Sequence, residues 1–106
     1  MTFENVRAHR VFNDEKLSKN AVFAEKDVAL VDVYCAQPGQ SQRVHAHPNA
    51  AKCYAILEGR ARVTIGNQSR DLVAGDLAYA PRGVPHGLEA LGPDALVALV
   101  FVAGSL

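Results

Sequence analysis

Three histidines carry the clearest chemical signal in the sequence. His45 and His47 are separated by one residue, and residues two apart in a β-strand point to the same side. Both imidazoles can therefore reach one metal ion, and neutral imidazole suits zinc, iron, nickel, copper and manganese. His86 follows a stiff segment, residues 81–85, that could hold it in a fixed position. Taken alone, the first two have a plainer interpretation, because paired histidines on a strand usually have no function. We interpret His9, which has no partner nearby in the sequence, as a surface residue.

The segments around these histidines have the pattern of a β protein. Residues 60–65 alternate strictly between polar and apolar side chains, which indicates a half-buried strand, and Gly66-Asn67 suits a tight hairpin turn. No helix is expected beyond a single turn at residues 13–17, with Asn13 as its cap. Many short strands separated by glycine- and proline-rich turns predict an all-β sandwich or barrel. Further strands are expected at residues 21–25, 28–36, 67–73 and 77–80.

Size and composition favour one soluble domain that spans residues 1–106. Eleven basic and eleven acidic residues give a net charge of zero, which supplies no attraction to nucleic acid or to anionic membranes. The longest apolar run, residues 95–103, is far shorter than the ~20 residues of a membrane helix. The N-terminus carries charges that a signal peptide would lack in its apolar part. We therefore expect a cytoplasmic protein. Cys35 and Cys53 are expected to be small apolar residues within strands rather than reactive thiols.

The apolar run at residues 95–103, ALVALVFVA, does not alternate. A strand that is apolar on both faces needs cover on both faces. One face would meet the core of the barrel. The other face could be covered by the N-terminal strands of the same chain or by a second copy of the protein, and we favour a homodimer.

Two blocks of residues with fixed spacing extend the histidine pattern. The first is Gly39-x5-His45-x-His47-x4-Lys52-x6-Gly59, and the second is Gly75-x5-Pro81-x-Gly83-x2-His86-x3-Ala90. At nearly every fixed position they resemble the paired motifs of the cupin superfamily, and the resemblance covers residues 36–102.

The resemblance implies a double-stranded β-helix, or jelly-roll barrel, with its core at about residues 28–103. It implies that His45, His47 and His86 point into the barrel as ligands of a divalent transition metal such as iron, nickel, manganese or zinc. Homodimers are usual among small cupins, which agrees with the apolar run at residues 95–103.

Two positions depart from the cupin pattern. Lys52 stands where a metal-binding glutamate is common, and Ala90 replaces a frequent asparagine. Without that carboxylate the ion keeps its full charge, and two like charges at 4 Å repel by about 4 kcal/mol at an effective dielectric of 20. Lys52 could turn toward the barrel mouth, lose its proton, or pair with Glu58, Glu89 or a bound anion. Alternatively, no metal is bound and the ammonium occupies its place.

Other side chains near the expected site are candidates for binding or proton transfer. Tyr54 shares the strand phase of Lys52 and should face inward, and the resemblance places Tyr79 inward as well. A tyrosine can carry a proton near a metal, although either residue alone is more simply aromatic core. Arg43 shares the phase of His45. At the cavity mouth it could bind a carboxylate or phosphate in bidentate fashion, or be a solvated rim residue.

Three functions fit this sequence. The first is a metal-dependent enzyme of dioxygenase, isomerase or lyase type that acts on a small anionic molecule. In it, Lys52 and Arg43 would attract the molecule, while Tyr54, Tyr79 or Lys52 would take part in catalysis. The second is a non-catalytic cupin that binds or senses a small ligand, with or without metal. The third is a cupin whose site has drifted and whose dimer surface is the remaining purpose.

Overall fold

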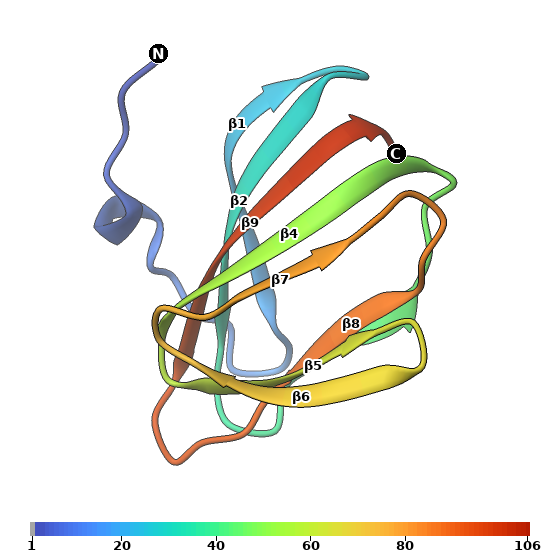
Figure 1. Cartoon of the computed structure of the whole chain (residues 1–106). Helices are drawn as coiled ribbons and strands as arrows, with labels where there is room; N and C mark the ends of the chain where they lie inside the picture. The colour runs from blue at the N-terminus through green and yellow to red at the C-terminus, as the bar shows by residue number, and fades with distance from the viewer. Residues whose placement is uncertain (1) are drawn as a thin grey trace.

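A computed structural model describes residues 2–106, and its regular secondary structure consists almost entirely of β-strands (Figure 1). Within this range a 3₁₀ helix, η1 (Val6–His9), precedes nine strands. In residues 2–106 no helix has the length and apolar character needed to cross a membrane. The strands are β1 (Ser18–Glu25), β2 (Ala29–Ala36), β3 (Ser41–His45), β4 (Asn49–Glu58), β5 (Arg60–Ile65), β6 (Gln68–Val73), β7 (Leu77–Ala80), β8 (His86–Ala90) and β9 (Leu96–Ser105).

The predicted bounds of β5 and β7 are confirmed, and those of β2 and β6 differ by one residue. β1 begins three residues earlier than expected. The single helical turn at residues 13–17 is wrong, because this segment is a bend. Asn13 still acts locally as a cap, since its Oδ1 accepts hydrogen bonds from the backbone N–H groups of Glu15 and Lys16.

Two antiparallel sheets face each other and form a jelly-roll barrel (Figure 1). The larger sheet has the strand order β1-β2-β9-β4-β7, and the smaller has the order β3-β8-β5-β6. Strands distant in sequence pair with one another, as β2 does with β9 and β3 with β8. The predicted all-β double-stranded β-helix is therefore confirmed, and its long-range pairings bring the two histidine-bearing segments side by side.

The core lies between the sheets, and the alternation within each strand determines which side chains enter it. Along β4 every second residue from Ala50 to Ile56 is buried, because successive side chains point to opposite faces of the sheet. Lys52 belongs to this inward series and is only 5% exposed. The largest fully buried side chains are Tyr34, Tyr54, Ile56, Leu96 and His86.

The outer face of the larger sheet is covered along part of its length only. The N-terminal segment lies against it near the start of β9, where partly buried Val6, Phe12 and Val22 pack on Val33, Cys35 and Val97. Further along β9, Phe101 is 46% exposed. The alternative in which the chain's own N-terminal segment covers the last strand is thus correct for one end of that strand.

Candidate metal centre

The structure brings the three predicted histidines together at one end of the barrel interior. His45 ends β3 and pairs across the sheet with His86, which begins β8, while His47 follows two residues after His45. One ring nitrogen from each residue lies within 4.8 Å of those from the other two. The ring centroids are 4.7 Å apart for His45 and His47, 4.6 Å for His45 and His86, and 5.6 Å for His47 and His86.

Hydrogen bonds to backbone carbonyls define which nitrogen of two rings faces the cluster. His45 Nδ1 lies 2.8 Å from the Arg43 carbonyl oxygen, and His86 Nδ1 lies 3.0 Å from that of Val84. Because a carbonyl can only accept, each Nδ1 carries the hydrogen and donates it, which leaves Nε2 with a free lone pair in the neutral ring. Metal-binding histidines are commonly oriented by a bond of this kind.

The donor set fits a divalent transition metal. The Nε2 atom of His86 is buried and has no hydrogen-bond partner in the described residues. Leaving a buried acceptor unpaired costs about 1–3 kcal/mol, and an ion shared with the other two rings would satisfy it. Burial, more than the nearby positive charges, lowers the pKa of His86 to about 4 and also lowers that of His47. These two rings are therefore neutral near pH 7, which is the form that binds a metal.

A β-bulge in β3 determines which side chains accompany the histidines. Gln42 pairs with Leu88 and His45 with His86, so three steps along β3 match two along β8. The extra residue brings Gln42 onto the inner face, where it is 6% exposed, and leaves Arg43 exposed. Arg43 therefore does not share the phase of His45 as expected, and its side chain lines the rim of the cavity.

The absence of a side chain at Gly87 permits this bulge. A Cβ atom there would lie 2.8 Å from the Gln42 carbonyl oxygen and 3.0 Å from the Val44 Cα, both of which are backbone atoms. Only glycine lets the bulged strand approach β8 so closely.

Lys52 belongs to a buried polar network rather than to the imidazole cluster. Its Nζ donates to the Tyr34 hydroxyl oxygen at 2.9 Å, and Gln42 Nε2 donates to the same oxygen at 3.0 Å. The Tyr54 hydroxyl in turn donates to Gln42 Oε1 at 2.5 Å. Sequence reasoning missed this role of Tyr34 and Gln42. The phase of β2 could have placed Tyr34 inward, but no signal revealed the bulge that turns Gln42 in.

The surroundings of Lys52 weaken the repulsion expected between its ammonium group and a metal ion that has no glutamate ligand. Burial lowers the pKa of Lys52 to about 8, the Lys19 charge adds to this effect, and Asp32 opposes it. Glu58 is not its partner, because that carboxylate pairs with Arg10 at 2.8 Å, and Glu89 is exposed. Lys52 instead donates to the Tyr34 hydroxyl, which was not among the expected outcomes.

The two predicted tyrosines lie on opposite faces of the larger sheet. Tyr54 is fully buried and meets His86 edge-on, with ring centroids 6.3 Å apart. Tyr79 is 60% exposed, so the expectation that it faces inward is wrong. Its partner across the sheet is Cys53, and opposed residues share a face. Since Cys53 alternates with the inward Lys52 and Tyr54, Tyr79 points away from the barrel.

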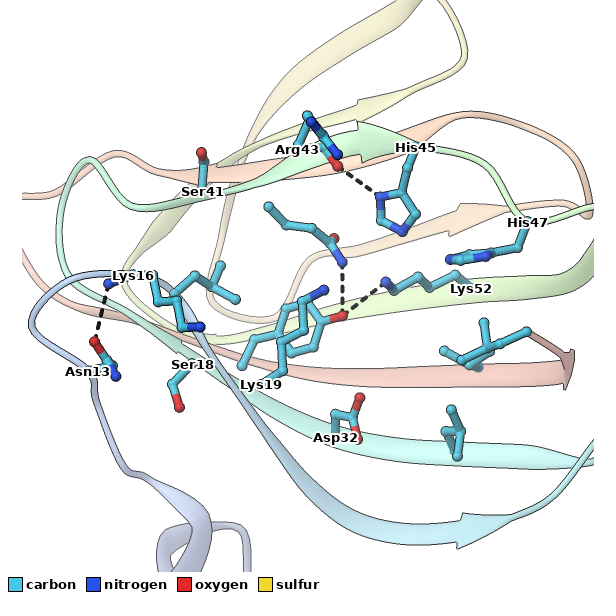
Figure 2. Close-up of a pocket in the computed structure, with 16 residues that line it drawn as sticks. Asn13, Lys16, Ser18, Lys19, Asp32, Ser41, Arg43, His45, His47 and Lys52 are labelled. Atoms are coloured by element: carbon cyan, nitrogen blue, oxygen red, sulfur yellow. Dashed lines mark hydrogen bonds between the residues drawn. The ribbon is translucent and has the colours of Figure 1, made fainter.

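A cavity of about 870 Å³ connects the histidine cluster to solvent (Figure 2). His45, His47, Lys52, Tyr34 and Gln42 contribute to its wall together with Lys16, Lys19, Arg43 and Asp32. His9 lies outside this cavity, and its Nε2 contacts Glu4 Oε1 at 3.0 Å.

Comparison with known proteins places this geometry in context. A family model described as Cupin domain matches residues 32–102. The crystal structure of a Thermus thermophilus protein has a TM-score of 0.93 and 34% identity, and the match covers 100% of both chains. An uncharacterized protein of Streptomyces coelicolor is 28% identical over 100 residues, which are 92% of this chain and 90% of that one.

The oxalate decarboxylase of Bacillus subtilis (strain 168) is 40% identical over 74 residues. The match covers 65% of this chain but 19% of the decarboxylase, so the chain spans about a fifth of that enzyme's length.

Proposed function

This chain belongs to the cupin domain family, and on that premise we propose that it is an enzyme that binds a divalent transition metal and acts on a small anionic molecule. The ligands are His45, His47 and His86. The observation that carries the proposal is the convergence of three ring nitrogens within 4.8 Å, one of them buried and unpartnered. An ion held there would supply Lewis-acid or oxygen-activating chemistry, which suits a dioxygenase-, isomerase- or lyase-like reaction.

The residues of the chain around the ion divide into binding and positioning roles. Lys52 and Arg43 line the cavity and supply positive charge for an anionic molecule. Tyr54 is better suited to positioning than to proton transfer, because its hydroxyl hydrogen is held by Gln42 and burial raises its pKa well above the usual range. Lys52 therefore remains the candidate for proton transfer among the cavity residues, and Tyr79 drops out because it lies on the outer face.

Element analysis of protein purified without a histidine tag tests this proposal. We expect one equivalent of iron, nickel, manganese or zinc per chain, and at least a tenfold loss of affinity for that metal in His47→Ala. His9→Ala is the matched control, because His9 lies outside the cavity, and it should retain the metal. Wild-type protein that takes up none of the four metals on reconstitution would contradict the proposal.

A non-catalytic cupin that binds or senses a small ligand is the second candidate. The cavity is large enough for a small ligand and its wall is positively charged, and both features would let it bind an anion without a metal. Tight binding of an anion without metal uptake, and without turnover, would select this function over the first.

We also propose that residues 1–106 form one domain, with its barrel at about 28–103, and that two copies associate through the exposed outer face of the larger sheet. Phe101, Cys53 and Tyr79 are neighbours across β9, β4 and β7 on this face, and two of them are 46% and 60% exposed aromatics.

Light scattering after gel filtration tests the dimer. We expect a dimer for the wild type and a monomer for Phe101→Glu. Val73→Glu, at a 49% exposed position on β6 in the other sheet, is the control and should leave the dimer intact. A monomeric wild-type protein would contradict this part of the proposal.

A further inference from the structure

A second lysine, Lys19 on β1, faces the same space as Lys52. Lys19 is the partner of Tyr34 across the β1–β2 pair, and opposed residues share a face, so its side chain lies on the cavity side of the sheet. Its Nζ is 5.7 Å from the centroid of the Tyr34 ring, and Lys52 Nζ is 5.2 Å from the same centroid. Figure 2 shows both lysines extending into the cavity, with Asp32 nearby on β2.

Neither lysine of this pair forms an ion pair within residues 2–106. The ion pairs within these residues are Arg10–Glu58 and Arg62–Asp71, and neither involves a residue that lines the cavity.

Asp32 is the one acidic side chain among the described residues of the cavity wall, and it forms no ion pair with either lysine. Its single charge is outnumbered by those of Lys16, Lys19, Arg43 and Lys52, which line the same wall. Repulsion from the Lys19 charge also contributes, after burial, to the lowered pKa of Lys52.

We propose that Lys19 and Lys52 together form a subsite for an oxyanion, a carboxylate or a phosphate, beside the Tyr34 hydroxyl and next to the histidine cluster. An oxyanion between two ammonium groups accepts a charge-assisted hydrogen bond from each and removes their mutual repulsion. This inference rests on the proposed function, because the subsite would hold the anionic end of a substrate whose other end reaches the metal. The substrate would then carry two functional groups, an oxyanion for the lysines and a second group for the metal. Lys19 would be a specificity-determining residue.

Isothermal titration of metal-free protein, prepared by dialysis against a chelator, tests the subsite directly. The probes are malonate, inorganic phosphate and malonamide, the last being a neutral molecule of the same shape as malonate. We expect malonate or phosphate to bind at least tenfold more tightly than malonamide, and the tighter of the two anions identifies the preferred oxyanion. Equal binding of malonate and malonamide would overturn the proposal.

Charge-changing variants show whether the binding depends on these lysines. Lys19→Gln should weaken anion binding at least fivefold, whereas Lys26→Gln should change it less than twofold, because exposed Lys26 lies in the β1–β2 turn outside the cavity. Asp32→Asn should tighten binding, because it removes the opposing charge from the same wall. Equal losses in the Lys19 and Lys26 variants would overturn the assignment. Lys19 is exposed, so its substitution leaves the buried network and the folding of the barrel undisturbed.

The outcome separates this inference from the proposed function. Because the titration uses metal-free protein, anion binding that depends on Lys19 would support the subsite even in a chain that never takes up metal. Conversely, a chain that binds metal stoichiometrically but shows no preference for malonate or phosphate over malonamide would keep the metal centre and remove the subsite.

Discussion

The two halves of the barrel interior share strands β4 and β8 but differ in chemistry. In one half, Ile56, Leu96 and Leu88 belong to a buried apolar cluster that joins the two sheets. In the other half, the same strands β4 and β8 present Lys52 and His86. Lys52 donates a hydrogen bond to the Tyr34 hydroxyl oxygen, which also accepts one from Gln42. The change occurs within two to four residues along each strand.

This contrast separates what stabilises the barrel from what it can bind. Apolar burial contributes about 25 cal/mol per Å² and needs no particular register beyond the alternation of side chains. The polar half depends on specific partners, because each buried polar group needs a hydrogen bond. Among residues 2–106, His86 Nε2 finds no such partner. Substitutions in the apolar half should therefore act on stability, and those in the polar half on stability and on ligand binding together.

The largest expected effect is a loss of stability from the apolar half. Ile56 is 1% exposed, and Ile56→Ala should lower the free energy of unfolding by about 4 kcal/mol through lost burial and the cavity left behind. Affinity for zinc, measured on the fraction that remains folded, should change less than about threefold. Denaturant unfolding and metal titration give the two quantities. A parallel collapse of zinc affinity would show that the two halves are not separable.

The next effect concerns the backbone that shapes the polar half. In Gly87→Ala the new Cβ would meet backbone atoms of the β3 bulge, so either strand has to move. We expect a loss of about 2–3 kcal/mol in stability, as is typical of overpacking. Because His45 and Gln42 both depend on the bulge, zinc affinity should fall as well. A destabilised variant with wild-type zinc affinity would mean that the bulge does not position His45.

The same contrast explains how much the sequence could predict. The alternation in residues 60–65 and the inward phase of Tyr54 follow from a period of two, and both are confirmed because β5 and β4 are regular there. Phase counting missed that Gln42 faces inward and that Arg43 leaves the phase of His45, because a bulge changes the period without changing the composition of the strand. Tyr79 was misplaced for another reason, since its side of the sheet depends on pairing with Cys53.

The polar network could not be predicted from the sequence, because it depends on which strands pair. Tyr34, Gln42 and Lys52 come from three strands, and their contacts exist only once the pairings of β2 with β9, β9 with β4 and β3 with β8 are known. Their spacing in the chain carries no signal of that arrangement, whereas the histidines share the recognisable spacing of their two blocks.

A smaller effect, opposite in sign, is expected at Lys52. A pKa lowered from 10.5 to about 8 corresponds to about 3 kcal/mol of disfavoured protonation. Removing the charge while losing one hydrogen bond worth about 1 kcal/mol should stabilise metal-free Lys52→Met by about 2 kcal/mol at pH 7.

The sign follows from proton linkage. Between pH 8 and 10.5 the unfolded chain binds more protons at Lys52 than the folded one, so the wild type should gain stability as the pH rises through that window. The variant should lack this rise. Unfolding experiments at pH 7 and pH 10 measure it, and parallel pH profiles for the two proteins would show that Lys52 is not held in an unfavourable environment.

The smallest effect comes from the same chemical change made on two faces of one sheet. Tyr54→Phe removes the hydroxyl that donates to Gln42 and leaves the Gln42 Oε1 atom buried without that partner. We therefore expect the free energy of unfolding to fall by about 1 kcal/mol. Tyr79→Phe removes the same hydroxyl from a 60% exposed position and should change stability by less than about 0.5 kcal/mol. Both are measured by denaturant unfolding of metal-free protein. Because the two substitutions are chemically identical, their difference isolates the buried hydrogen bond. Equal effects would mean that the network holds Gln42 without Tyr54, and the polar half would then depend on Lys52 and Tyr34 alone.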